Sequence, residues 1–293
     1  MALTLTGTGQ GGVFTLRGRS FGGSFTTSTA PPSLLLDTYP GAAAAYSLRK
    51  LRTAYTGAAI RVKRLNDGIE SDIGFNTNGQ LDSTSLTTFV GVNSAIVVRW
   101  YDQSGNSNNA SVTDPNALSG NPRIVNLGVI NLQNGKPSIE FFVNPMNFIT
   151  NLPSINSSCF LIGKANSNSI SGPLFGTTDP GVFIGQQIGN YAIYKGSTTN
   201  LSFHRTAANS STTNFKINSF FTDTNNIFVN NTLIPITENG TFTGSSFTIQ
   251  NIGNYAAFYS TQGFISEAII YSSNISSNLT AINANINSYY SIY

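Results

Sequence analysis

The sequence predicts an all-β fold in which two sheets pack face to face as a sandwich. From Ala59 onward, short segments with alternating apolar and polar residues are separated by turn residues, as is typical of such folds. Turn sequences such as Asn78-Gly79, Asn134-Gly135 and Asp179-Pro180-Gly181 supply residues that tolerate a positive φ or fix φ. With 293 residues, 40% of them hydrophobic, the chain can bury one large core. We therefore expect one main domain.

The predicted strands are numerous enough to fill two sheets. They are expected at Ile60–Arg64, Ser94–Tyr101, Ser138–Val143, Cys159–Lys164, Val182–Gln186, Tyr191–Lys195, Asn214–Phe221, Ile227–Val229, Phe247–Asn251 and Phe264–Tyr271.

Two helices are predicted beside these strands. Ala43 to Leu51 is a short run of strong helix formers and predicts an N-proximal helix. Near the C-terminus, apolar residues recur at spacings of three and four, which places them on one helical face: Ile275, Leu279, Ile282 and Ile286. Ser273 or Asn274 is positioned to cap this second helix, which we expect to lie on the sandwich.

Residues 1–33 predict an extended N-terminal arm, and residues 34–293 the main domain. The arm consists mainly of Gly, Thr, Ser and Phe, which is too thinly apolar to fold alone, and Asn is absent before Asn66. Phe14, Phe21 and Phe25 are its candidate anchoring residues, and we expect them to dock onto a partner subunit. The alternative is that the arm forms a first strand on its own domain.

Composition excludes several classes of function. Only 9% of the residues are charged, the net charge is +3, and no run of Lys or Arg follows the pattern of a nucleic-acid-binding surface. No apolar run approaches the ~18 residues of a membrane span, and the N-terminus lacks the charged-then-apolar order of a secretory signal. One cysteine, Cys159, and one histidine, His204, exclude an internal disulfide and the usual structural zinc site. We expect no cofactor.

Four segments resemble a known family. They are Leu34 to Gly74, the run Trp-Tyr-Asp-Gln-Ser-Gly-Asn at residues 100–106, Asn134 to Pro137, and Gln262 to Tyr271. The first three resemble the catalytic domain of the arabinofuranosidase B family, and domains of similar sequence occur in phage virion proteins. The last is similar to the close of concanavalin A-like and laminin-G-like jelly rolls. The resemblance implies a jelly-roll fold but supports activity less strongly, because one fold hosts many functions.

Glycoside hydrolysis normally needs two carboxyl groups, one as acid and one as nucleophile or base. The resembled family carries acids in two segments that read here as Ile252-Gly253-Asn254-Tyr255 and Val182 to Gln186, neither of which contains an acid. We therefore predict that the protein is not an enzyme. Glu267 is the fallback catalytic residue, although a structural role is expected for it.

The loop at residues 100–106 is the candidate ligand-binding site. Tyr101, Asp102, Gln103 and Asn106 combine an aromatic ring with amide and carboxylate groups, as carbohydrate sites on lectin-like sandwiches do. Asp102, with Asn106 and Asn108, is also a weak candidate for holding Ca²⁺ through oxygen ligands. The alternative is a turn in which Asp102 caps its own backbone.

Together these patterns predict a phage virion structural protein: a capsid decoration protein, a head fibre or a tail fibre subunit. Its arm would bind other virion proteins, the protein could form a homo-oligomer, and the jelly roll would face outward from the virion surface toward a cell-surface glycan. Neither nucleic acid nor a membrane is an expected partner. The alternative is an arabinofuranosidase-like glycoside hydrolase, which would need two acids in one cleft.

Overall fold

The structure is a computed structural model, which describes residues 33–117, 119–154, 156–167, 171–177, 181–187, 189–197, 200–206, 213–240, 248–255 and 259–293. Its helices are α1 (Leu35–Thr38), α2 (Ser83–Val90) and α3 (Leu279–Tyr290), the last preceded by a 3₁₀ turn, η1 (Ser276–Asn278). The strands of its first half are β1 (Ala42–Ser47), β2 (Ile60–Arg64), β3 (Glu70–Ile73), β4 (Ala95–Trp100), β5 (Ala110–Ser111), β6 (Arg123–Asn126), β7 (Val129–Ile130), β8 (Leu132–Gln133), β9 (Lys136–Pro137), β10 (Ile139–Phe141) and β11 (Met146–Pro153). Those of its second half are β12 (Ser158–Ala165), β13 (Leu174–Gly176), β14 (Val182–Gln187), β15 (Asn190–Ser197), β16 (Asn200–Thr206), β17 (Lys216–Phe221), β18 (Asn226–Val229), β19 (Thr232–Ile234), β20 (Ile236–Asn239), β21 (Thr248–Ile252), β22 (Asn254–Tyr255), β23 (Tyr259–Ser260) and β24 (Gly263–Tyr271).

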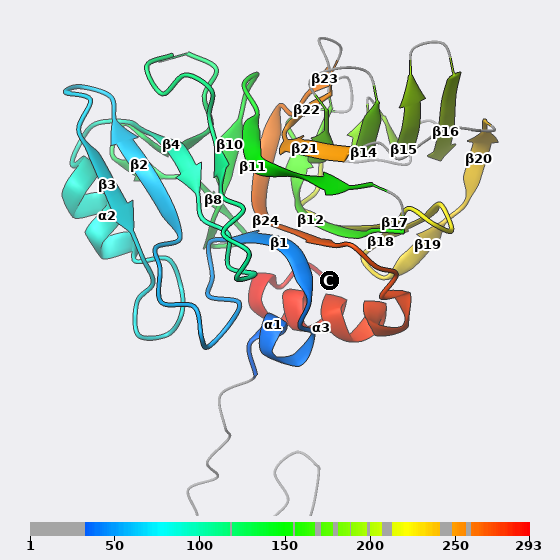
Figure 1. Ribbon diagram of the computed structural model, residues 1–293. Coiled ribbons are helices and arrows are strands. Elements are labelled where there is room, and N and C mark those ends of the chain that lie inside the picture. The colour runs from blue at the N-terminus through cyan, green and yellow to red at the C-terminus, as the bar shows by residue number, and fades with distance from the viewer. Residues whose placement is uncertain are drawn as a thin grey trace, which may run out of the picture. The chain divides into compact units, whose positions relative to one another are not determined.

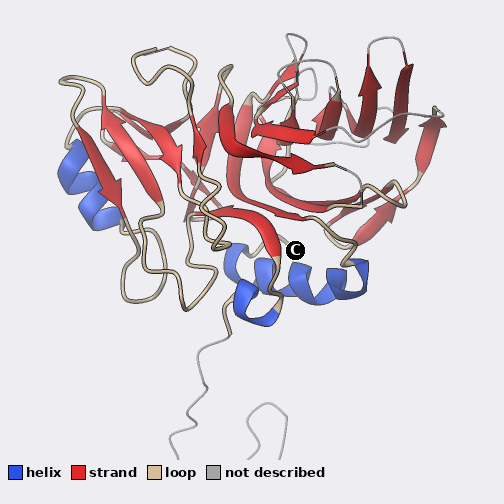
Figure 2. Ribbon diagram, in the orientation of Figure 1, coloured by secondary structure: helices blue, strands red, loops and turns tan. Residues whose placement is uncertain are grey.

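Antiparallel strands form the two layers of a sandwich (Figures 1 and 2). In one layer β24 pairs with β12 along one side, and with β10 and then β1 along the other; β12 continues into β17, β18 and β19. The other layer runs β11, β21, β13, β14, β15, β16 and β20. Strand β4 pairs with β2, β5 and β6 and so joins the layers at one side, because β5 pairs with β11 and β6 with β10. The predicted all-β sandwich is confirmed.

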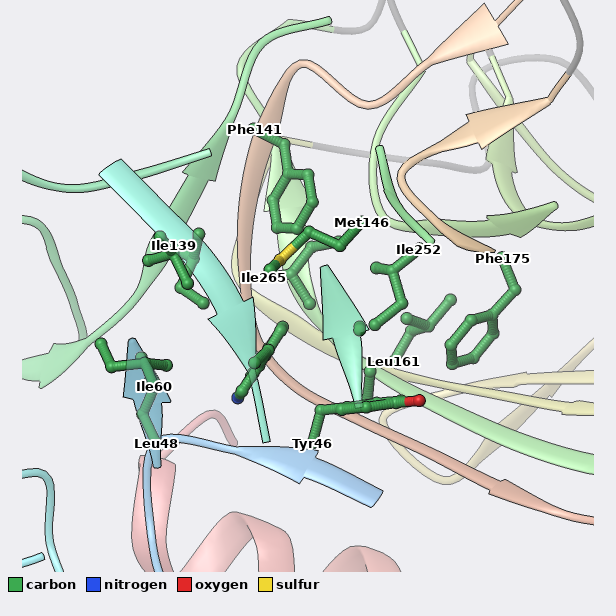
Figure 3. Packing of buried hydrophobic residues seen from close by; sticks show 14 of the residues in the cluster. Tyr46, Leu48, Ile60, Ile139, Phe141, Met146, Leu161, Phe175, Ile252 and Ile265 are labelled. Carbon is green, nitrogen blue, oxygen red and sulfur yellow. The ribbon is translucent and has the colours of Figure 1, made fainter. Parts of the chain in front are cut away.

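The main core lies between the layers and is filled by alternate residues of their strands. Along β12, Cys159 and Leu161 point into this core, while Phe160 and Ile162 point to the opposite face of the sheet. This is the two-residue side-chain period of a strand buried on both faces. Figure 3 shows Leu161 among core residues contributed by other strands: Tyr46, Phe175, Ile252 and Ile265.

The second core lies outside the β1, β24 and β12 layer, where α1 and α3 cover it (Figure 1). Leu279, Ile282, Ile286 and Tyr290 of α3 are buried there against Phe160 and Phe221, among other residues. The predicted C-terminal helix is therefore confirmed. Asn274 Oδ1 accepts a hydrogen bond of 2.8 Å from the Ser276 backbone N–H at the start of the 3₁₀ turn, whose N-cap position is Ile275.

The helix predicted from Ala43 to Leu51 is wrong. These residues form most of strand β1, and the short N-proximal helix is α1, which lies just before it. Ala44 and Tyr46 pack into the main core, and Ala42 and Ala45 into the second core, so both faces of β1 are buried. Burial between two cores and pairing with β24 outweigh the small intrinsic helix preference of alanine.

Residues 33–293 form one compact unit. The predicted arm, with Phe14, Phe21 and Phe25, lies outside the described residues apart from its last residue, Ser33. None of the helices described is long and apolar enough to cross a bilayer.

Candidate functional site

The loop after β4 holds neighbouring segments of the fold together through hydrogen bonds. We call residues 102–108 the clasp loop. Asp102 is buried, and its two carboxylate oxygens accept four hydrogen bonds: from the backbone N–H groups of Ala45, Ser104 and Asn108 and from the Ser104 hydroxyl, at 2.7–3.0 Å. Since a carboxylate has about four acceptor positions, Asp102 has none left for a ligand or Ca²⁺.

Gln103 and Asn106 hold the start of the domain in the same way. The Gln103 side chain is fully buried; it accepts from the Leu51 N–H at 2.8 Å and donates to the carbonyls of Ser47 and Arg49. Asn106 donates to the carbonyls of Ala42 and Ala43, both at 3.0 Å. The turn interpretation of this loop therefore accounts for three of the four predicted ligand-binding residues. Among the described residues, no cluster of His, Cys, Asp or Glu could hold a metal ion.

Removing the Asp102 carboxylate is expected to destabilise the fold. An Asp102→Ala variant leaves buried donors such as the Ala45 N–H without partners, so we expect it to lower the free energy of unfolding by about 2–3 kcal/mol. Urea denaturation followed by circular dichroism measures this loss. Asp114→Ala is the control, since Asp114 caps only the exposed Asn116 N–H. A loss equal to that of the control would contradict the clasp assignment.

Glu267, the fallback catalytic residue, forms a buried ion pair. Its side chain is 0% exposed and accepts from Arg49 Nε at 2.8 Å, from Arg49 Nη2 at 3.0 Å and from the Ser47 hydroxyl at 2.7 Å. Tyr290 covers the pair from α3, with its hydroxyl 3.4 Å from Glu267 Oε2. Glu267 therefore joins β24 to the end of β1, the segment after it, and α3.

The two segments in which the resembled family carries its acids lie close together. The Gln186 N–H donates to the Pro173 carbonyl at 3.0 Å, and the Gly253 N–H to the Leu174 carbonyl at 2.9 Å, so both segments flank the start of β13. The side chains there are the amides of Gln186 and Asn254, which do not exchange protons as carboxyl groups do. Neither segment therefore supplies a carboxyl group as a general acid or base.

Glu70 and Asp72 are neighbours on the solvent face of β3. Ile73 points into the core, whereas Glu70 and Asp72 are exposed. Residues i and i+2 of a strand lie ~6.5–7 Å apart on one face. The side chains of Glu70 and Asp72 therefore project from the same side of β3.

The two carboxylates differ in their surroundings. Asp72 accepts both Arg61 Nε and Nη2 at 2.8 Å and the Tyr101 hydroxyl at 2.7 Å, which leaves one acceptor position on Oδ2. The hydrogen bonds from Arg61 and Tyr101 hold the pKa of Asp72 below its ordinary value, so it stays ionised at neutral pH. The Glu70 side chain forms no hydrogen bond or ion pair with any described residue. Glu70 lines a cavity of about 130 Å³ together with Arg61 and Arg99.

A larger cavity lies at the other end of β3, two residues beyond Asp72. We call it the Tyr55 cavity. Its volume is about 430 Å³ and its lining consists of Lys50, Tyr55, Thr56, Gly57, Ala58, Gly74, Phe75, Asn76, Thr77 and Gly79. Burial raises the pKa of Tyr55 to about 12, with smaller contributions from the charges of Asp102, Tyr101 and Asp72. Tyr55 and the Asp72 carboxylate are therefore near enough to interact electrostatically.

Comparison with known proteins relates the first part of this domain to one family of enzymes. The family model described as "Alpha-L-arabinofuranosidase B, catalytic" matches residues 37–129. Probable alpha-L-arabinofuranosidase B of Aspergillus flavus and alpha-L-arabinofuranosidase B of Aspergillus oryzae are each 34% identical over 82 residues. Those residues are 28% of this chain and 16% of each fungal protein, so the likeness covers a small part of the relatives.

Solved arabinofuranosidase structures share the fold over a longer stretch. An arabinofuranosidase complexed with arabinofuranosyl-alpha-1,2-xylobiose superposes with a TM-score of 0.54 at 15% identity. A GH54 arabinofuranosidase soaked with a cyclic sulfate inhibitor gives a TM-score of 0.57 at 16% identity. Each match covers 86% of this chain and 64% of the other. At such identity the likeness establishes the fold alone.

These comparisons correct the predicted function. The prediction of a phage virion structural protein without catalytic activity is wrong, because the match to the catalytic-domain model and the 34% identity to two arabinofuranosidases point to a glycoside hydrolase. The prediction treated the two segments without acids as decisive. Carboxyl groups on any strand that faces the same groove can act together, however, and Glu70 and Asp72 lie inside the matched residues.

Proposed function

We propose that this chain is an arabinofuranosidase-like glycoside hydrolase, which releases arabinofuranosyl units from a polysaccharide. The observation that carries the proposal is the pair Glu70 and Asp72 on one face of β3, inside the segment that matches the catalytic-domain model. The neighbouring Tyr55 cavity, at about 430 Å³, falls within the ~300–1,000 Å³ of small-molecule sites.

The roles of the two acids follow from their surroundings. Asp72, ionised by its contacts with Arg61 and Tyr101, is the base: its free position on Oδ2 takes a proton from water as the water oxygen bonds to the anomeric carbon. Glu70 is the other carboxyl group on this face of β3, and we assign to it the transfer of a proton to the glycosidic oxygen as the carbon–oxygen bond breaks. Arg61 and Tyr101 are positioning residues, since they hold the Asp72 carboxylate in place.

The proposal predicts hydrolysis with inversion at the anomeric carbon. The full chain is expected to release nitrophenol from 4-nitrophenyl α-L-arabinofuranoside, and proton NMR of the first product is expected to show β-arabinofuranose. Inversion follows from the proposed roles, because Asp72 activates a water molecule that attacks the anomeric carbon directly. Absence of turnover would overturn the proposed function. A first product of the α form would instead assign the chemistry to a different pair of acids.

A further inference from the structure

Two aromatic side chains form a wall of the Tyr55 cavity. Tyr55 and Phe75 meet edge to face, with ring centroids 6.3 Å apart and planes at 77°, and both remain half-exposed. The Tyr55 ring folds back over Gly57, where an added Cβ would lie 2.6 Å from the Tyr55 hydroxyl oxygen. That hydroxyl donates to the Ala58 carbonyl at 2.7 Å, which fixes the ring. Such a wall suits the C–H faces of a sugar ring.

The polar groups of this cavity that are free to bind a ligand favour one that is rich in hydrogen-bond acceptors. Among the described residues that line the cavity, Lys50 alone is charged, and its ammonium group forms no hydrogen bond or ion pair with any of the residues that the structure describes. Asn76 Oδ1 already accepts from the Asn78 and Gln80 N–H groups, so its free group is the donating amide nitrogen. Lys50 and Asn76 thus offer donors only, and the remaining polar side chains are the hydroxyls of Thr56 and Thr77.

We infer that the Tyr55 cavity binds a uronic acid unit of the polysaccharide. The inference rests on the proposed function and names the class of substrate that this function acts on. The sugar ring packs against Tyr55 and Phe75, and its carboxylate takes the charge-assisted hydrogen bond of Lys50 and the amide donor of Asn76. Because the lining contains no acidic residue, it offers the ligand carboxylate no like charge.

Binding of digalacturonate and of its dimethyl ester to the full chain, measured by isothermal titration calorimetry, tests this inference. The ester keeps both rings and removes both charges. We expect the acid to bind roughly 10-fold more tightly than the ester, because a hydrogen bond to a charged group is stronger than one to a neutral group. In the Lys50→Met variant, digalacturonate is expected to bind no more tightly than its dimethyl ester.

Lys164→Met is the matched control, because it removes the same charge from a residue on β12 that does not line the cavity. Its preference for the acid is expected to equal that of the unaltered chain, whose net charge of +3 attracts any anion weakly. Equal affinity for acid and ester would overturn the inference, as would an equal effect of the two lysine variants. Since binding is measured without turnover, this outcome is independent of the arabinofuranoside assay.

Discussion

Replacing Asp72 with asparagine is expected to lower kcat/KM for arabinofuranosides by about 10²–10⁴-fold, the usual contribution of a general base. The loss should be similar for 4-nitrophenyl α-L-arabinofuranoside and for an arabinosyl-xylose disaccharide, since both need an activated water. Azide needs no base to attack the anomeric carbon. Adding azide to Asp72→Ala is therefore expected to restore release of nitrophenol and to form the inverted glycosyl azide.

Glu70→Gln is expected to affect the two substrates unequally, in contrast to Asp72→Asn. Nitrophenolate leaves without protonation, so this variant is expected to lose far less activity on the aryl substrate than on the disaccharide. Asp67→Asn is the control, because Asp67 pairs with Arg64 at the turn between β2 and β3 and lines neither cavity of the site. Full activity of both the Glu70 and Asp72 variants would show that these residues are not the catalytic pair.

Replacing Glu267 with alanine is expected to lower the free energy of unfolding by about 3–5 kcal/mol. The Arg49 side chain is only 9% exposed, so the change leaves a buried guanidinium without its carboxylate partner. Urea denaturation measures the loss. Asp67→Ala is the control for an exposed pair, where no comparable loss is expected because water screens the charges.

A double variant separates the cost of an unpaired charge from the value of the ion pair itself. Replacing both Arg49 and Glu267 with methionine removes both charges and is expected to recover much of the lost stability. If Glu267→Ala were as stable as the unaltered protein, the buried pair would contribute nothing to the fold. Glu267 would then be open again to a role in catalysis.

The predictable part of the fold came from patterns that are local in sequence. Strand β2 was predicted with its observed bounds, Ile60–Arg64, because apolar and charged residues alternate there and neighbouring positions face opposite sides. Helix α3 was predicted from the spacing of Leu279, Ile282 and Ile286. Helix α2 was missed because Ser and Thr fill most of it, although Asp82, which accepts from the Ser85 N–H, is a recognisable cap.

The site depended on contacts that are distant in sequence. The sequence around Asp102 does not show whether its carboxylate binds a ligand or accepts the hydrogen bond of the Ala45 N–H, because Ala45 lies 57 residues away. Glu70 and Asp72 were detectable in principle, because two acids at i and i+2 share a face once a strand is assigned there. Asp72 also meets its charged partner, Arg61, only once β2 and β3 have paired.

The central position of β24 has a consequence for how this protein is made. Residues 263–271 are the partner of β1, which begins at Ala42, and also of β12 and β10. While the chain is being synthesised, β1 lacks the strand that it pairs with in the described structure, β24, until more than 200 further residues have left the ribosome. Closing a loop of that length is entropically slow. This sheet therefore cannot be completed until β24 has been synthesised.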